Sequence, residues 1–388
     1  MELGTEQVFA VYDAEDWWHK SNEQIFEIMG PAGSGKTTII LYLIERLGLT
    51  LEQVLFVAYM GKAAMVMAQK GLPAKTIHST IYRYEKEMVV EDGHIVLNAN
   101  GRPKTKLVQQ LKDKISNKIK LIVVDEGGLV NEEIGRDLAS FGVPIIALGD
   151  PNQLPPIFGK SFFFKHPNVI LTKVMRQAEG NPIIWLSQEV LQGNRLQKGI
   201  YGNSAVISKS DLNEYMFSQA DEVITYTNRL RYEVNNLFRE QFKKIKRLDT
   251  PVVGEKVVCR KNNWSKCIDD NVYLTNGTTG YIDYVDMSKF DGSKFKMDFL
   301  PDFSLTPFKN LQVDYKAMYA KPNEDVSSGY DFTSDKFEFG YAITTHMSQG
   351  SQFDNVLLLV EDCMPSNVRK NILYTGITRA VQRITIVI

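Results

Sequence analysis

Apolar runs of strand length recur along the first part of the chain, with helical or mixed stretches between them. They lie at Ile25–Met29, Val54–Ala58, Leu121–Val124 and Pro144–Leu148. Strands that are apolar on both faces are typical of a parallel sheet covered by helices on both sides. This part of the chain is therefore predicted to be an α/β domain, and ligands of such domains bind at the carboxyl ends of the strands.

The same alternation of apolar runs with helical stretches returns towards the C-terminus and indicates a second sheet domain. Its strands are expected at Glu222–Thr225, Phe339–Thr344, Asn355–Val360 and Arg383–Ile388. Two stretches do not follow this alternation. Met88–Leu97 is predicted to be a β-hairpin with Asp92-Gly93 as its tight turn. Between Pro251 and Gly329, short alternating runs predict a small antiparallel barrel. These runs are Lys256–Arg260, Gly280–Val285, Lys294–Phe299 and Leu311–Tyr315.

Length and composition agree with an intracellular protein of several domains. The chain has 388 residues, of which 44% are hydrophobic and 23% charged. Its longest apolar runs are only strand-sized, so no transmembrane helix is predicted. The first residues have neither the basic start nor the apolar segment of a signal peptide. The three cysteines fit no zinc pattern, so reduced thiols and a cytoplasmic location are expected (the host cytoplasm for a phage protein).

The net charge of −1 does not indicate a nucleic-acid-binding protein, but basic residues cluster locally. One cluster comprises Arg102, Lys104, Lys106, Lys112, Lys114, Lys118 and Lys120, and the other Arg239, Lys243, Lys244, Lys246 and Arg247. Each cluster is either a solvated helix face or a track for a polyanion.

A phosphate-binding loop is the most specific motif in the chain. Gly30-Pro31-Ala32-Gly33-Ser34-Gly35-Lys36-Thr37 matches GxxxxGK[ST] at every fixed position. It lies between the predicted strand Ile25–Met29 and a predicted helix, Thr37–Leu47, as the motif requires. The loop amides and the helix N-terminus attract phosphate oxygens. Lys36 is expected to reach the β- and γ-phosphates of a nucleoside triphosphate, and the Thr37 hydroxyl to hold Mg²⁺.

Carboxylates and an amide follow two other predicted strands. Asp125 ends one strand and could hold the same Mg²⁺, while Glu126 could orient or deprotonate a water. Gln153, in the turn Gly149–Pro156, could sense the γ-phosphate through its amide. Arg176 and Arg379 are candidate arginine fingers, although a single arginine more often forms a surface ion pair.

The order of these motifs resembles that of the superfamily 1 DNA helicases, most closely the RecD-like and phage Dda-like branch. Further matching segments are Thr5-Glu6-Gln7, Gly61–Ala64, Thr76–Ser79, Arg176-Gln177, Tyr226–Asn228, Thr345–Gly350 and Tyr374–Ala380. The resemblance implies an α/β fold of two RecA-like motor domains, with ATP in the cleft between them. It also implies a hairpin insert in the first domain and an SH3-like barrel insert in the second.

The expected domain limits are 1–81 with 119–175 for the first motor domain, 82–118 for the hairpin, 176–250 with 330–388 for the second motor domain, and 251–329 for the barrel. Catalytic roles are expected for Lys36, Glu126, Gln153, Arg176 and Arg379. ATP contacts are expected from Gln7, Gly30, Pro31, Ala32, Gly33, Ser34, Gly35, Lys36, Thr37, Thr38, Gln349 and Gly350, and Mg²⁺ contacts from Thr37 and Asp125. The resemblance implies DNA contacts from Lys62, His78, Asn228, Thr345 and His346; both histidines could equally be structural.

The predicted function is ATP-dependent unwinding of DNA, with travel from 5′ to 3′ implied by the resemblance alone. Expected partners are single-stranded DNA, forked or tailed duplexes and a single-strand-binding or replication protein, but no membrane. An RNA-directed motor stays open, because a backbone grip does not separate DNA from RNA. The third alternative is a nucleotide-gated clamp that does not unwind DNA. The presence of all the expected catalytic residues argues against a clamp: Lys36, Glu126, Arg176 and Arg379.

Overall fold

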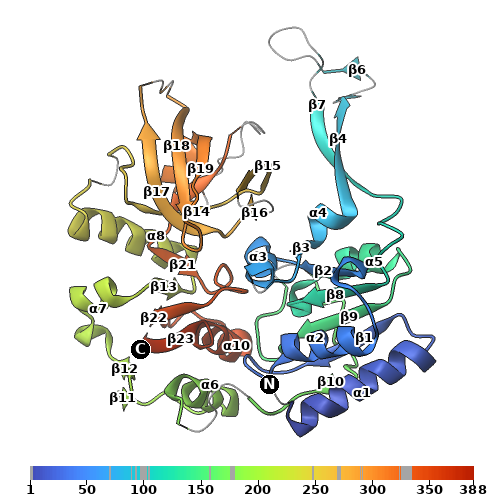
Figure 1. Cartoon of the computed structure of the whole chain (residues 1–388). Helices are drawn as coiled ribbons and strands as arrows, with labels where there is room; N and C mark the ends of the chain where they lie inside the picture. The colour runs from blue at the N-terminus through green and yellow to red at the C-terminus, as the bar shows by residue number, and fades with distance from the viewer. Residues whose placement is uncertain are drawn as a thin grey trace.

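The computed structural model describes residues 3–69, 71–88, 90–91, 94–96, 103, 105–156, 159–174, 180–246, 249–268, 272–288, 290, 292–322, 324 and 334–388. Two α/β units stand side by side, and a β-sheet unit and a two-stranded arm rise above them (Figure 1). Among the described residues, no helix has the length and apolar character needed to cross a membrane.

The first unit is built on a parallel sheet with strand order β10-β1-β9-β8-β2-β3. Its strands are β1 (Ile25–Met29), β2 (Val54–Ala58), β3 (Lys75–Thr76), β8 (Leu121–Asp125), β9 (Ile145–Gly149) and β10 (Val169–Ile170). The expected strands of this unit are thus confirmed to within a residue at each end. Because β1, β9 and β8 are neighbours, the segments that follow them meet at one edge of the sheet.

Helices cover both faces of this sheet. They are α1 (Thr5–Lys20), α2 (Lys36–Arg46), α3 (Gly61–Gln69), α4 (Ile77–Ile81) and α5 (Glu132–Ala139). Helix α2 presents Ile39, Ile40 and Leu43 to the core that it shares with α1 and β1, and this three- and four-residue spacing makes one apolar face. The opposite face of the sheet packs against α4 and α5.

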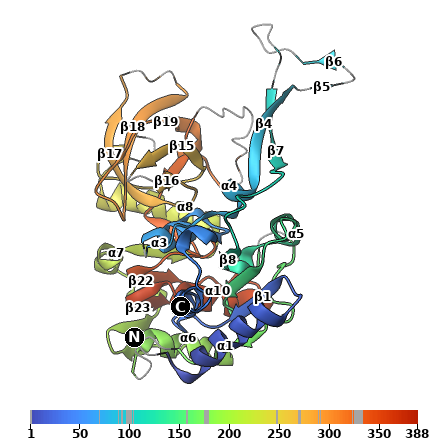
Figure 2. The ribbon, with the colours of Figure 1, turned by 45° about the vertical axis from the view of Figure 1, so that its right-hand side comes forward.

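A long antiparallel arm projects from the first unit (Figures 1 and 2). Strands β4 (Tyr82–Met88) and β7 (Thr105–Leu111) pair along their whole length, and the short strands β5 (Val90–Glu91) and β6 (His94–Ile95) pair beyond them. The arm therefore begins six residues before the expected hairpin Met88–Leu97. The turn expected at Asp92-Gly93 lies outside the described residues.

The second unit has a mainly parallel sheet with strand order β11-β12-β23-β22-β13-β21. Its strands are β11 (Gly199–Tyr201), β12 (Ser204–Ile207), β13 (Glu222–Thr225), β21 (Ala342–Thr344), β22 (Phe353–Leu359) and β23 (Ala380–Val387). Helices α6 (Pro182–Gln192) and α10 (Ser366–Ile377) pack on one face, and α7 (Glu214–Gln219) and α8 (Asn228–Leu237) on the other. The α/β class with parallel sheets is confirmed.

An antiparallel sheet with strand order β19-β18-β17-β14-β20 lies above the second unit. It comprises β14 (Lys256–Cys259), β17 (Thr279–Asp286), β18 (Lys294–Pro301), β19 (Phe308–Asp314) and β20 (Phe337–Phe339), accompanied by β15 (Asn263–Ile268), β16 (Val272–Leu274) and α9 (Tyr315–Tyr319). We call these elements the barrel insert. Buried aromatic side chains, among them Phe295, Phe299 and Phe337, fill its core. Its SH3-like character and the domain limits given above stay predictions.

One expected strand was wrong. Phe339–Thr344 is not continuous, because β20 belongs to the barrel insert and β21 to the second parallel sheet. The chain passes between the two sheets at Gly340, where a Cβ atom would lie 2.7 Å from the backbone carbon of Val257. The lack of a side chain therefore permits this close crossing.

Candidate functional site

The phosphate loop lies between β1 and α2, and its shape depends on glycine. Gly33 and Gly35 both have φ of 83°, in the left-handed region that favours glycine. A Cβ atom on Gly35 would lie 2.1 Å from Gln7 Nε2. Gln7, which is buried, donates from Nε2 to the Ser34 carbonyl oxygen at 3.0 Å and accepts from the Gly4 amide at 2.9 Å. Gln7 thus fixes the loop from the first turn of α1.

The Lys36 side chain folds back onto the backbone of the phosphate loop. Its Nζ donates to the carbonyl oxygens of Gly30 at 2.6 Å and Pro31 at 3.1 Å. Both acceptors are neutral backbone carbonyl oxygens, so neither of these two hydrogen bonds neutralises the ammonium charge. The Ser34 hydroxyl is buried and has no hydrogen-bond partner among the residues that the structure describes. A cationic loop with spare donors fits an anionic phosphate group.

The acidic pair stands at the end of β8, two strands from the loop. Glu126 has φ of 52°, which is uncommon for a residue with a side chain and turns the backbone sharply after Asp125. The Glu126 amide donates to Asp125 Oδ1 at 3.0 Å. Desolvation of the half-buried side chain and the neighbouring Asp125 raise the pKa of Glu126 to about 7, against the opposing charges of Arg379 and Lys36. A carboxylate with this pKa can exchange protons near neutral pH.

The turn after β9 is held by the second unit. Asn371 Nδ2 donates to the carbonyl oxygens of Asn152 at 3.0 Å and Gln153 at 3.3 Å, and Thr375 Oγ1 accepts from the Leu154 amide at 3.2 Å. Gln153 Oε1 is nevertheless buried and has no partner among the described residues. The backbone of Gln153 is therefore fixed across the cleft, while its side-chain oxygen makes no hydrogen bond to another described residue.

Tyr374 forms a second bridge across the cleft. Its hydroxyl donates to Asp150 Oδ2 at 2.9 Å and accepts from the Ala32 amide at 3.4 Å. The ring is buried in the core of the second unit. One side chain of α10 therefore contacts both the phosphate loop and the turn after β9.

Arg379 follows α10 and is buried in the cleft. Its guanidinium donates to the Thr375 and Ser351 carbonyl oxygens at 3.1 and 3.2 Å and to Thr378 Oγ1 at 3.3 Å. These contacts hold it within the second unit, where its charge acts on Glu126 of the first. The other candidate finger, Arg176, lies outside the described residues.

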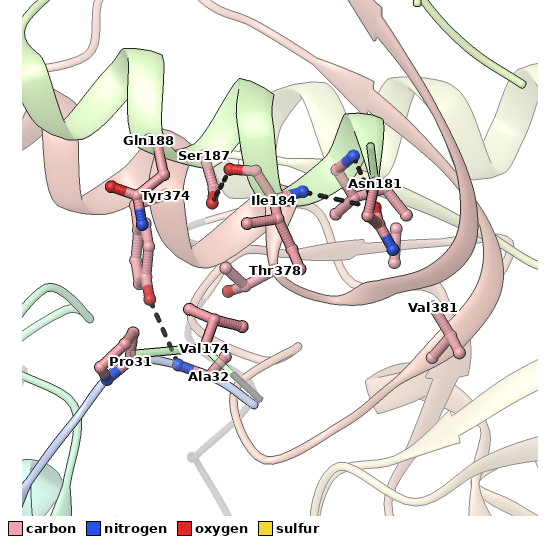
Figure 3. Close-up of a pocket in the computed structure, with 12 residues that line it drawn as sticks. Pro31, Ala32, Val174, Asn181, Ile184, Ser187, Gln188, Tyr374, Thr378 and Val381 are labelled. Carbon is pink, nitrogen blue, oxygen red and sulfur yellow. Dashed lines mark hydrogen bonds between the residues drawn. The ribbon is translucent and has the colours of Figure 1, made fainter. Parts of the chain in front are cut away.

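A cavity of about 300 Å³ opens beside the phosphate loop (Figure 3). Pro31 and Ala32 form one side, and α6 and the end of α10 form the other, with Ile184, Gln188 and Tyr374 among the lining side chains. Sequence reasoning did not assign a site role to α6 or to Tyr374. Tyr374 lies in a motif that was recognised, but α6 carries no motif, so only its position could reveal it.

The remaining expected ATP contacts lie around this cleft. Gln349 Nε2 donates to the Leu154 carbonyl oxygen at 3.3 Å. Gly350 has φ of 70°, and a Cβ atom there would lie 2.8 Å from the Cβ of Ala63. Both residues therefore contact the first unit from the second. Thr37 and Thr38 are in the first turn of α2, and Thr37 is partly exposed beside the loop.

The expected DNA contacts differ in accessibility. Asn228, the first residue of α8, is exposed, and His346 is half-buried with its ring centroid 6.3 Å from that of Tyr226. His78 lies between aromatic rings in the first unit, and burial lowers the pKa of both histidines. Thr345 is fully buried and bonded through its amide and hydroxyl to the Thr225 carbonyl oxygen.

Lys62 is also buried. Its Nζ donates to Thr279 Oγ1 of the barrel insert at 3.0 Å and lies 4.7 Å from the centroid of the Phe353 ring. Burial lowers the pKa of Lys62 to about 8. In this structure its side chain joins the first unit to the barrel insert, so a strand reaches it only if the insert moves.

A phosphate loop, an acidic pair and an arginine from a facing α/β unit define a P-loop nucleotide-binding protein with two domains around one cleft. The AAA domain family matches residues 5–210, and the UvrD-like helicase C-terminal domain family matches residues 339–387. The first match spans more than half of the chain. The chain therefore belongs to the AAA domain family. With its UvrD-like C-terminal part, it is similar to helicases of the RecD-like and Dda-like branch of superfamily 1.

Individual relatives agree with this assignment. The chain is 24% identical over 290 residues to the ATP-dependent RecD2 DNA helicase of Deinococcus radiodurans, covering 68% of this chain and 35% of the relative. It is 27% identical over 280 residues to the ATP-dependent DNA helicase dda of Enterobacteria phage T4, covering 62% and 57%. The chain thus spans about a third of RecD2 and little more than half of dda.

The fold is similar to that of the Pif1 helicase from Bacteroides, solved in complex with ADP-AlF3 and single-stranded DNA. The TM-score is 0.56 at 19% identity, and the match covers 99% of this chain and 92% of Pif1. At this identity the likeness concerns the fold.

Proposed function

We propose that this chain is an ATP-driven DNA helicase motor that travels along single-stranded DNA from 5′ to 3′ and separates duplex strands. The proposal is carried by one observation: the charges of Lys36 in the first unit and of Arg379 in the second unit both act on Glu126 in the same cleft. Groups from both units must meet around the same phosphates for hydrolysis to occur. Hydrolysis is therefore linked to domain closure. The expected domain limits and DNA contacts are part of this proposal.

Each residue of the cleft has a proposed task. Lys36 and the loop amides would hold the phosphates of ATP. Gln153 would sense the γ-phosphate by donating from its amide nitrogen to a phosphate oxygen, while its amide oxygen would accept from a water. Thr37 and Asp125 would hold Mg²⁺, which supplies positive charge to phosphate oxygens when bound. Glu126 would accept a proton from the attacking water, and Arg379 would stabilise negative charge.

The nucleic-acid contacts would run along the upper edge of the two units. Asn228, which is exposed, and His346, which is half-buried, would contact the strand, and His78 would extend the track over the first unit. Lys62 and Thr345 would join the track when the barrel insert moves from α3. Contacts to phosphates, with bases stacked on rings, would make binding tolerant of sequence and sensitive to salt.

The test is unwinding of a short duplex that carries a single-stranded tail on either the 5′ or the 3′ side, with ATP and Mg²⁺. The proposal expects release from the 5′-tailed duplex only and no release by Glu126→Gln. Release from the 3′-tailed duplex alone would refute the polarity. Strand-stimulated ATP turnover without release from either duplex would refute autonomous unwinding and leave a translocase or a partner-dependent motor.

Two controls address the alternative functions. Competition between DNA and RNA oligonucleotides of the same sequence would identify an RNA-directed motor, which the 2′-hydroxyl distinguishes. ATP turnover that does not respond to any single strand would instead indicate a nucleotide-gated clamp.

A further inference from the structure

A second cavity, of about 190 Å³, lies between α8 and the barrel insert. Its walls carry the side chains of Asn228 and Arg231 from α8, and of Arg260, Lys336 and Glu338 from the insert. Figures 1 and 2 show α8 next to the sheet of the barrel insert. Arg260, Lys336 and Glu338 are not among the residues described above for the cleft between the two α/β units.

The cavity carries excess positive charge. Its lining has a net charge of +2, because it includes four basic residues (Arg231, Arg260, Lys321 and Lys336) and two acidic residues (Glu324 and Glu338). Glu338 bonds to Arg231 through one oxygen and to Arg260 Nε through the other, at 3.3 Å. One carboxylate therefore orients two guanidinium groups without neutralising both, which leaves an arrangement suited to a second anion.

The cavity also continues the proposed strand track. Asn228 Oδ1 accepts from Arg231 Nε at 3.3 Å, so the exposed amide at the start of α8 is joined directly to the first arginine. Tyr226, whose ring neighbours His346, lies two residues before Asn228. A strand that passes His346 and Asn228 would therefore place its next phosphates at the cavity.

We propose that this cavity is a phosphate-binding subsite for single-stranded DNA, with Arg260 and Lys336 of the barrel insert as its phosphate ligands. The inference rests on the proposed function, because it extends the strand track of that function. It gives the insert a task in holding the strand where it leaves the second α/β unit. Both arginines are paired with Glu338, but Arg231 is buried and also bonded to Asn228, so it serves mainly to position the site, whereas Arg260 is more exposed.

The experiment measures the affinity of a fluorescent oligo-dT for the full chain by anisotropy, at several KCl concentrations. The variant R260Q/K336Q removes two phosphate contacts. Each contact to a single strand contributes about 0.7 to the slope of log Kd against log [KCl], so the slope should fall by about 1.4. Extrapolated from 1 M salt, where such contacts contribute little, this is a roughly tenfold loss of affinity at 200 mM KCl.

The matched control is K20Q/K209Q, which removes the same charge from two exposed, ion-paired lysines away from the cavity. Its slope should stay within about 0.3 of the parent value. An equal fall in both double variants would refute the subsite and attribute the effect to net charge. An unchanged slope in R260Q/K336Q would refute it directly.

A variant with the opposite expected effect on affinity keeps the test decisive if R260Q/K336Q fails to fold. Glu338→Gln keeps the shape of the side chain, removes the carboxylate that is paired with both arginines and should tighten binding with a steeper slope. Weaker or unchanged binding by folded Glu338→Gln would overturn the proposal. A parent chain that binds no oligonucleotide at any salt concentration would instead refute the proposed function itself, which separates the two failures.

Discussion

The bridge made by Tyr374 gives the sharpest test of how the two α/β units are coupled. Tyr374→Phe removes the hydroxyl that contacts Asp150 and Ala32 but keeps the ring in the core of the second unit. The fold of each unit should therefore survive. What changes is the free energy of the closed cleft, because the lost hydrogen bonds connect one unit to the other.

The expected size of the shift depends on the two hydrogen-bond partners of the Tyr374 hydroxyl. A hydrogen bond to a charged acceptor such as the Asp150 carboxylate contributes about 1.5–3 kcal/mol, and the contact to Ala32, at 3.4 Å, adds little. At about 1.4 kcal/mol for each factor of ten, the equilibrium between closed and open cleft should shift roughly 10- to 150-fold towards open. If hydrolysis requires the closed cleft, strand-stimulated kcat falls by up to that factor.

The assay combines turnover with a distance across the cleft. ATP hydrolysis is measured with saturating oligonucleotide, and energy transfer is measured between labels at Lys20→Cys and Lys209→Cys, with Cys267 and Cys363 replaced by serine. Tyr374→Phe should lower kcat and lengthen the distance between the labels.

The control is Tyr201→Phe, which removes an exposed hydroxyl bonded to the Gln197 carbonyl oxygen within the second unit. It should change neither quantity. A double-mutant cycle of Tyr374→Phe with Asp150→Asn should show a coupling of about 1–2 kcal/mol. Equal label distances in parent and Tyr374→Phe, with unchanged kcat, would refute the reasoning.

Three further outcomes concern the phosphate loop and the acidic pair. Lys36→Ala should lower ATP turnover by about a hundredfold or more with an unchanged circular dichroism spectrum, and turnover near the parent rate would remove Lys36 from the catalytic site. Gly35→Ala should lower stability to urea by more than Gly48→Ala. Both glycines have positive φ, but only at Gly35 would the new Cβ meet Gln7, at 2.1 Å, so equal losses would contradict that contact. Single-turnover hydrolysis should rise from pH 6 to 8, because Glu126, whose pKa is about 7, accepts a proton only when deprotonated. A pH profile without an ionisation in that range would exclude Glu126 as the base.

Much of the local structure could be predicted from the sequence. The strands Ile25–Met29 and Val54–Ala58 have the predicted limits, because an uninterrupted apolar run between turn residues leaves few other ways to bury its side chains. The phosphate loop was equally clear, since its glycines and lysine are consecutive residues whose chemistry is local. The fold class follows from the same signals, because helices and strands that alternate along a chain form covered parallel sheets.

Errors and omissions arose where distant segments meet. The expected strand Phe339–Thr344 divides at Gly340 because two sheets cross there, a fact that depends on Val257 far away in the sequence. A short hairpin was expected at Met88–Leu97, and the pairing of β4 with β7 outside it was not predicted, because that pairing joins segments that are not adjacent in the sequence. Neither feature has a signal within its own few residues.

The sequence by itself therefore determined the parts of the site, namely a loop for phosphate, an acidic pair and a late arginine. Only the tertiary structure decided how they act together. It placed the Tyr374 hydroxyl on Asp150 and Ala32, buried Lys62 under the barrel insert and brought Arg379 within electrostatic reach of Glu126. Propensity and motif spacing are properties of neighbouring residues, whereas burial, electrostatic field and hydrogen-bond partners across a cleft arise only when distant segments pack together.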